Sequence, residues 1–278
     1  MSARPADRSV RTRRRRDADR RFGVRLFASA AVAAVAAVLF GLLLVLVESG
    51  WGPLRHLDAG AARWLNRTAL DHPAWTGTLH FLSEGVWDPF TLRVAVALLT
   101  LWLVYRRAWR LAAWSAVTAV AGGLTGLLVK TVVERARPSL QDPVAHAPGF
   151  SFPSGHAMTA VTSFGILLLV LLPMVRRGLR PVCWAVAAVS VVGVGFTRIA
   201  LGVHWFSDVV GGWTLGLAVV ALTGWSFEAW RADAGLGRTE VAEEGLEPEL
   251  GGDAPESPAA EPGPPGRVGE DTGKGPEG

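Results

Sequence analysis

The sequence predicts an all-α membrane protein, a bundle of six transmembrane helices with a short interfacial helix between the first two. Half of the 278 residues are hydrophobic, and they gather in long uncharged runs separated by short charged breaks, as membrane spans do. The first run, residues 26–47, is about 33 Å long as a helix, which is enough to cross a bilayer. Tryptophans lie near the ends of the runs, where an aromatic belt is expected.

Five further spans are expected at residues 90–105, 111–129, 157–175, 181–196 and 209–225. They are rich in Gly and Ala, which allows close helix packing within a membrane. Between the first two spans, Leu54, Leu57, Ala61 and Leu65 recur at helical spacing. This pattern predicts a short amphipathic helix on the outer membrane surface.

Charge divides the chain into three parts. Residues 1–25 hold ten arginines and three aspartates, residues 26–228 form the predicted six-span domain, and residues 229–278 are rich in Gly, Pro and Glu. The first part is expected to be a basic cytoplasmic segment that contacts an anionic membrane surface rather than nucleic acid. The last is expected to be a disordered acidic tail. The single cysteine, Cys183, excludes an internal disulfide.

Arginines in the short breaks predict the orientation in the membrane. They follow the second and fourth spans, at Arg106, Arg107 and Arg110 and at Arg176, Arg177 and Arg180. With six spans, both breaks share a side with the basic N-terminal segment. The positive-inside rule therefore predicts a plasma (inner) membrane protein with both termini in the cytoplasm.

Three polar clusters interrupt the apolar pattern, and the topology puts all of them at the outer face. Their members are Lys130, Arg135 and Arg137; Ser154, Gly155 and His156; and Arg198, His204 and Asp208. Guanidinium forks and an ammonium group match phosphate oxygens. A helix that starts at Ser154 and Gly155 would add free N–H groups and a favourable dipole. The three clusters together predict a phosphate site.

The same clusters contain reactive groups. Asp208 follows His204 by four residues, so on a helix the carboxylate can hold one imidazole N–H while the other nitrogen is free to attack. His156 can protonate a leaving oxygen. Arg135 is expected either to contact the headgroup, adding charge for a second phosphate, or to pair with Glu134.

Three ordered motifs carry a family resemblance. Lys130-x6-Arg137-Pro138, Pro153-Ser154-Gly155-His156 and Arg198-x5-His204-x3-Asp208 resemble the signatures of the type 2 phosphatidic acid phosphatase superfamily. The resemblance covers about residues 26–228, with Thr197 in place of the usual Ser. It implies a lipid phosphatase without metal or cofactor, in which His204 forms a phosphohistidine, Asp208 orients it, and His156 acts as acid and then as base. The implied phosphate-binding residues are Lys130, Arg137, Ser154, Gly155 and Arg198.

The sequence leaves other functions open. A phosphotransferase would use the same motifs, and a non-catalytic lipid binder or transporter would also need the cations. A metallohydrolase with His156, His204 and Asp208 as ligands is disfavoured by the cations, which would repel a metal. A haloperoxidase is disfavoured because those relatives are soluble. Among bacterial lipid phosphates, we favour undecaprenyl pyrophosphate over phosphatidylglycerophosphate, phosphatidic acid and diacylglycerol pyrophosphate, since an outward-facing site would meet that carrier after it delivers its glycan. The sequence does not indicate the oligomeric state.

Overall fold

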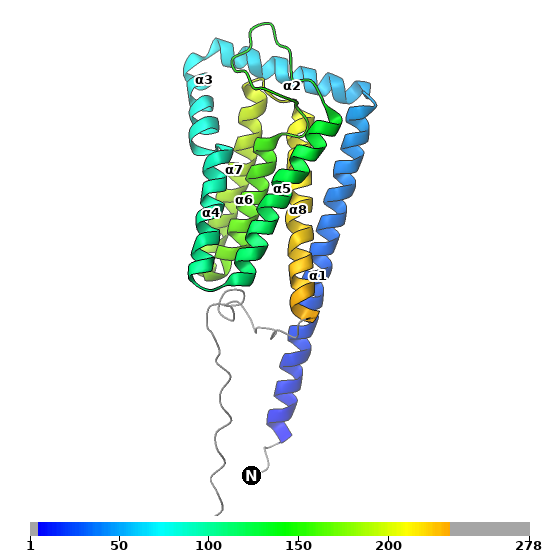
Figure 1. Cartoon of the computed structure of the whole chain (residues 1–278), viewed down its shortest axis with the longest axis vertical. Coiled ribbons are helices and arrows are strands. Elements are labelled where there is room, and N and C mark those ends of the chain that lie inside the picture. Colours follow the sequence, from blue (N-terminus) through cyan, green and yellow to red (C-terminus); the bar gives the residue numbers. More distant parts are fainter. Residues whose placement is uncertain (1–4, 234–278) are drawn as a thin grey trace, which may run out of the picture.

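A computed structural model describes residues 5–233 of the chain, with side chains described for residues 27–230. All regular elements in this range are helical (Figure 1): α1 (Pro5–Glu48), α2 (Gly52–Asp71), α3 (Pro73–His80), the π-helical turn η1 (Phe81–Val86), α4 (Pro89–Tyr105), α5 (Trp109–Val133), α6 (Gly155–Leu171), the short turns η2 (Leu172–Met174) and η3 (Arg177–Leu179), α7 (Arg180–Ala200) and α8 (Phe206–Asp233).

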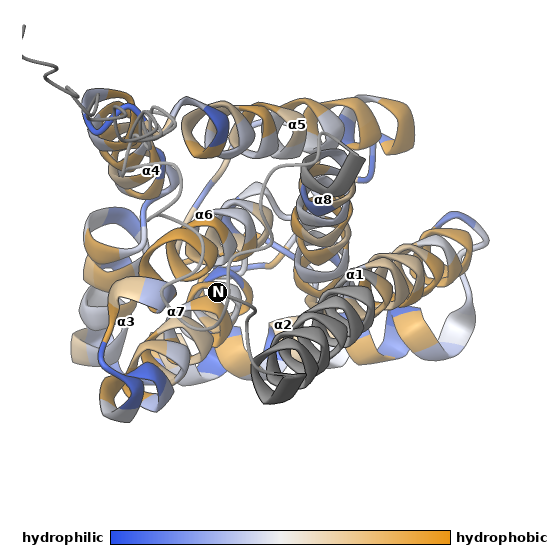
Figure 2. Ribbon diagram, turned by 90° about the horizontal axis from the view of Figure 1, so that it is seen from below, coloured by the Kyte–Doolittle hydropathy of each residue, from blue (hydrophilic) through white to orange (hydrophobic). Residues whose placement is uncertain are grey.

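The six predicted spans are confirmed. Helices long and apolar enough to cross a membrane cover Phe27–Glu48, Pro73–Tyr105, Trp109–Val133, Gly155–Met174, Arg177–Ala200 and Phe206–Trp230, and their surfaces are largely apolar (Figure 2). Most spans are longer than predicted because hydropathy falls at a polar residue, whereas the helical hydrogen bonding continues through it. Helix α8 continues to Asp233, beyond the predicted domain end at residue 228. The rest of the predicted acidic tail, residues 234–278, lies outside the described residues.

Helix α6 is the centre of the bundle. It contacts α4, α5, α7 and α8, while α1 packs along α8 (Figures 1 and 2). Helix α2 and the long α5–α6 loop both cross the same end of the bundle. This end is the one at which the three polar clusters meet, and it is called the site end below.

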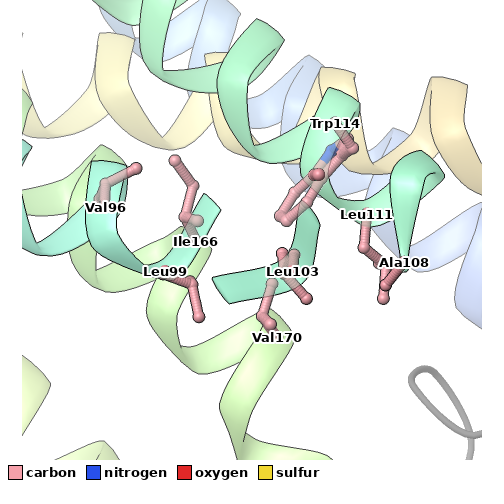
Figure 3. Close-up of a cluster of buried hydrophobic side chains, with 9 residues drawn as sticks. Val96, Leu99, Leu103, Ala108, Leu111, Trp114, Ile166 and Val170 are labelled. Carbon is pink, nitrogen blue, oxygen red and sulfur yellow. The ribbon is translucent and has the colours of Figure 1, made fainter. Parts of the chain in front are cut away.

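A hydrophobic cluster joins α4, α5 and α6 at the opposite end (Figure 3). Its buried members include Val96, Leu99, Leu103, Trp114, Ile166 and Val170. Lipid tails are as apolar as these side chains, so in a membrane the cluster is stabilised by close packing more than by removal from water. It holds the three helices together away from the site and leaves their other ends free to carry polar groups.

Helices α6 and α8 touch backbone to backbone at the site end. A Cβ added at Gly212 would lie 2.6 Å from the Ser154 carbonyl oxygen, and one at Gly216 would lie 3.1 Å from that of Met158. Only glycine allows such an approach. The seam brings the first turn of α8 against the start of α6, where Ser154 N donates to Asp208 O at 2.9 Å.

Helix α2 occupies the position of the predicted interfacial helix. Its buried residues are Asp58, Ala62, Leu65, Asn66 and Ala69. Within the predicted apolar stripe, Leu65 is buried, whereas Leu57 is 49% exposed. Asp58 and Asn66 point inward to polar partners; Asn66 Nδ2 donates to Asp142 O at 3.1 Å. The location of α2 at the membrane surface remains a prediction.

Candidate active site

The three predicted clusters converge at the site end. Lys130 lies in the last turn of α5, Gly155 and His156 begin α6, and His204 lies in the short link between α7 and α8. A Cβ built on Gly155 would lie 3.9 Å from Lys130 Nζ. His156 interacts electrostatically with four residues of the other clusters: Arg198, His204, Lys130 and Arg137. The structure therefore gathers in one place the residues that the sequence singled out.

His204 is held in an orientation that leaves one ring nitrogen available. The residue is 2% exposed. Its Nε2 is 3.2 Å from Arg137 Nη1, and its Nδ1 is 3.4 Å from Asp208 Oδ2. A guanidinium can only donate, so Nε2 must accept and the proton belongs on Nδ1. The lone pair of Nε2 thus points toward the cations.

The Asp208 carboxylate is completely buried and has several donors. Oδ2 accepts from Trp205 N at 2.8 Å and from the Ser151 hydroxyl, and Oδ1 accepts from Arg135 Nη1 at 2.6 Å. Ser151 Oγ is also 3.4 Å from His204 Nδ1. The sequence analysis did not identify Ser151, which precedes the Pro-Ser-Gly-His motif. These donors keep the carboxylate ionised and fixed beside the imidazole.

Arg135 fits neither of its two expected roles. Its guanidinium bridges two carboxylates, with Nη1 on Asp208 and Nη2 on Asp58 Oδ2 at 2.7 Å. Nη1 also donates to Ser207 Oγ at 2.7 Å, and the group lies 5.7 Å from the centre of the Trp205 ring. Arg135 therefore pairs with the Asp208 and Asp58 carboxylates instead of Glu134, and its guanidinium is not free for a substrate headgroup.

Asp58 completes this buried ion cluster from α2. Its Oδ1 accepts from Ser207 N at 2.9 Å, and its Oδ2 accepts from Ser207 Oγ at 2.6 Å. Sequence reasoning missed Asp58, although one signal was available: it lies four residues after Leu54 and four before Ala62, on an otherwise apolar stripe. Through Asp58, helix α2 is connected to the site.

Arg137 is positioned mainly by backbone carbonyls. Nε donates to Gly149 O at 3.0 Å, Nη2 to Pro148 O at 3.0 Å, and Nη1 to Val203 O at 2.7 Å. Burial lowers the pKa of Arg137, and the negative charge of Asp208 opposes the shift. The side chain joins the α5–α6 loop to the α7–α8 link and presents its charge to His204.

Arg198 keeps a free donor in the site. The side chain is buried, and Nη1 donates to Ser83 Oγ on η1 at 2.9 Å. Its Nε is buried without an acceptor among the described residues. A buried donor is costly when unpaired, so this position favours an incoming acceptor such as a phosphate oxygen.

Ser154 has mainly structural contacts. Its N–H goes to Asp208 O, and its hydroxyl caps α6 by accepting from Ala157 N at 3.5 Å. The N–H groups of Gly155 and His156, in the first turn of the helix, have no acceptor within the helix and suit an anion. Within the described part of the chain, no group of three or more His, Cys, Asp or Glu side chains is arranged to hold a metal ion.

We expect His204 to remain neutral in mild acid. Burial lowers its pKa from the ordinary 6.5 to about 4, although Asp208 opposes the shift. The unfolded chain therefore binds more protons than the folded one between these values, and the free energy of unfolding should fall as pH drops from about 6.5 toward about 4. Histidine NMR in detergent should show an imidazole that titrates near pH 4 and is missing from His204→Asn. A His204 signal titrating at or above 6.5 would contradict this.

We expect Asp58→Asn to slow turnover roughly 10-fold with little change in KM, because Asp58 acts on Asp208 through Arg135 and does not touch substrate. Asp71→Asn, an exposed carboxylate on the same helix, is the matched control. Thermal unfolding of both variants shows whether a fall in activity comes from less folded protein or from slower turnover. Equal turnover numbers in Asp58→Asn and the control, or a rise in KM alone, would exclude this positioning role.

Part of the chain is similar in sequence to known proteins. Residues 110–232 match the PAP2 superfamily model. Phosphatidylglycerophosphatase B of Bacillus subtilis (strain 168) is 38% identical over 102 residues, which cover 36% of this chain and 49% of the relative. Undecaprenyl-diphosphatase of Sulfolobus acidocaldarius is 29% identical over 149 residues, which cover 50% of this chain and 65% of the relative. The chain thus spans less than two thirds of either relative.

The fold is also similar to a solved structure. The crystal structure of a transmembrane PAP2 type phosphatidylglycerolphosphate phosphatase from Bacillus subtilis superposes with a TM-score of 0.63 at 22% sequence identity, covering 75% of this chain and 98% of the other. That likeness concerns the fold alone. The matched region contains all three motifs, from Lys130 through Asp208. Over residues 110–232 the chain is therefore similar to the PAP2 superfamily.

Proposed function

We propose that this chain is a membrane lipid phosphate phosphatase that works without a metal and through a phosphohistidine, with residues 26–228 as the catalytic domain. The orientation of His204 is the observation that carries the proposal. Its Nδ1 faces the buried Asp208 carboxylate, and its Nε2 faces Arg137 at 3.2 Å. A neutral imidazole held in this way is a nucleophile aimed at a cationic site.

In the first step, His204 Nε2 attacks phosphorus and the bond to the leaving oxygen breaks. His156 donates a proton to that oxygen, and the Nδ1 proton stays on the Asp208 side. Lys130, Arg137 and Arg198 stabilise the charge on the equatorial oxygens of the transferring group. The long 3.4 Å contact between His204 and Asp208 is expected to shorten as the imidazole becomes positive.

In the second step, water attacks the phosphohistidine. His156, now neutral, takes the proton from water, the P–N bond breaks, and phosphate leaves with His204 restored. A phosphotransferase would use another acceptor here, and the products tell the two apart. Free phosphate in amounts equal to the lipid consumed identifies a hydrolase.

The expected substrate is a lipid phosphate or pyrophosphate whose tail remains in the bilayer. The names of the relatives support this class, since one is a phosphatidylglycerophosphatase and another an undecaprenyl-diphosphatase. We favour undecaprenyl pyrophosphate, but one argument for it no longer holds. Arg135 cannot serve a second phosphate while Asp58 and Asp208 occupy its guanidinium.

The test of mechanism uses variants and excess chelator. His204→Ala should abolish phosphate release, and Asp208→Asn should lower turnover about 10⁴-fold, as loss of the orienting carboxylate does in a comparable triad. His156→Ala should harm lipid esters more than aryl phosphates, whose leaving groups need no proton. His146→Ala, an exposed histidine of the α5–α6 loop, is the control. Activity that survives His204→Ala, or that requires added zinc or magnesium, would refute the mechanism.

We further propose that the protein lies in the plasma membrane with both termini in the cytoplasm and the active site facing outward. Support comes from the arginine-rich breaks at Arg106–Arg110 and Arg176–Arg180, which lie at the opposite end from the site, near the N-terminal half of α1.

In a background where Cys183 is replaced by Ser, a cysteine at His146 should react with an impermeant thiol reagent added to intact cells. A cysteine at Arg177 should react only after the cells are opened, because its end of the bundle faces the cytoplasm. The opposite pattern would invert the topology and move the site to the cytoplasmic face.

A further inference from the structure

A groove extends from the proposed phosphate site into the membrane region. It lies between α4 and α5 over α6, has a volume of about 550 Å³, and reaches from Lys130 and Gly155 to Ile166. Leu101, Val120 and Leu127 on its rim are exposed, so the groove opens sideways toward lipid. Its apolar walls suit a hydrocarbon chain.

One charged residue of this groove has no role in the mechanism above. Arg93 projects from α4, and its Nη2 donates to Thr159 Oγ1 on α6 at 3.5 Å. Among the described residues, no carboxylate lies within ion-pair distance of Arg93. The groove therefore contains a cation whose charge is not neutralised by the protein.

Arg93 is exposed on α4 and lies four residues after Pro89, so it is about one helical turn inside the site end of the helix. An ionisable side chain within a membrane-spanning helix is costly, and it tends to mark a functional site with an anionic partner.

Arg93 and Lys130 line the same groove, and the partner of Arg93 lies one helical turn from the proposed phosphate site. Thr159, its partner, follows Gly155 by one helical turn, so their Cβ positions are about 6 Å apart on the same face. Lys130 Nζ is 3.9 Å from the Cβ position of Gly155. The guanidinium of Arg93 is thus the next cation on the membrane side of Lys130.

We infer that Arg93 and Thr159 form a second anion subsite, which binds a phosphate that belongs to the leaving group of the lipid. This inference rests on the proposed phosphatase activity. A lipid whose tail enters the groove places its terminal phosphoryl group at His204 and any tail-side phosphate one step deeper. Lipid diphosphates and phosphatidylglycerophosphate carry such a second phosphate, whereas phosphatidate does not.

The subsite also acts on the chemistry. As His204 Nε2 bonds to the terminal phosphorus, the bridging P–O bond breaks and its electron pair stays on the departing lipid phosphate. That oxygen takes its proton from His156. Arg93 offers a charge-assisted hydrogen bond to the departing phosphate, and this bond strengthens as negative charge builds there.

The test compares kcat/KM of Arg93→Gln on farnesyl diphosphate, phosphatidylglycerophosphate and phosphatidate. Relative to phosphatidate, kcat/KM for at least one of the two substrates with a second phosphate should fall roughly 10- to 100-fold, and Arg93→Lys should recover part of it. If kcat/KM falls selectively for farnesyl diphosphate, the group bound at Arg93 is a phosphate bridged directly to the terminal one. If it falls selectively for phosphatidylglycerophosphate, the bound group is the phosphodiester of that lipid. Arg106→Gln, at the far end of the same helix, should leave all three rates unchanged.

The inference would be overturned if the ratios of kcat/KM between the substrates were unchanged in Arg93→Gln, or if Arg106→Gln changed them equally. Arg93 would then be a residue whose side chain only extends to the membrane–water interface. If the wild-type protein hydrolyses none of the three lipids, the proposed function fails but the subsite is still tested by binding. The wild type should then bind farnesyl methylenebisphosphonate more tightly than farnesyl phosphonate, and Arg93→Gln should lose this preference. An unchanged affinity ratio would exclude the subsite.

Discussion

The buried carboxylate of Asp208 is the group on which the rest of this structure depends. A charge without contact with solvent is tolerated only when it is paired and hydrogen-bonded. Its partners come from three parts of the chain: Arg135 after α5, Ser151 before α6, and His204 with Trp205 in the link before α8. The imidazole is oriented only when all of these segments have docked. The geometry of the site therefore depends on correct packing of the site end of the bundle.

The three arginines of the site have different roles because their hydrogen-bond and ion-pair partners differ. Arg135 is neutralised by two carboxylates and stabilises them in turn. Arg137 is two residues further along, yet it is held by carbonyl groups and retains a contact with His204. Arg198 keeps a buried Nε without an acceptor in the described structure. Counting cations in a motif therefore overstates how many of them are available to a phosphate.

The sequence predicts the spans and the converging motifs well, because both follow from local patterns. Long apolar runs determine the helices, and His204 and Asp208 are only four residues apart, His204 in the link before α8 and Asp208 in its first turn. The rest depends on contacts between distant positions. Asp58 and Ser207 are 149 residues apart, and no periodicity in either segment indicates that they meet. The inward face of α2 could not be predicted for the same reason, since hydrophobic spacing does not reveal that a carboxylate turns inward to an ion cluster.

If the protein has the proposed activity, the sideways opening between α4 and α5 determines which substrate concentration matters. A lipid that enters between Leu101 and Leu127 would not pass through water, so it would arrive by two-dimensional diffusion. The relevant measure of substrate would then be its mole fraction in the leaflet, and adding inert lipid would dilute it although the bulk molarity stays constant. Bilayer thickness and fluidity would thereby become variables of the kinetics. The same aperture would return the dephosphorylated lipid to the leaflet from which it came, while the released phosphate would depart through the aqueous end.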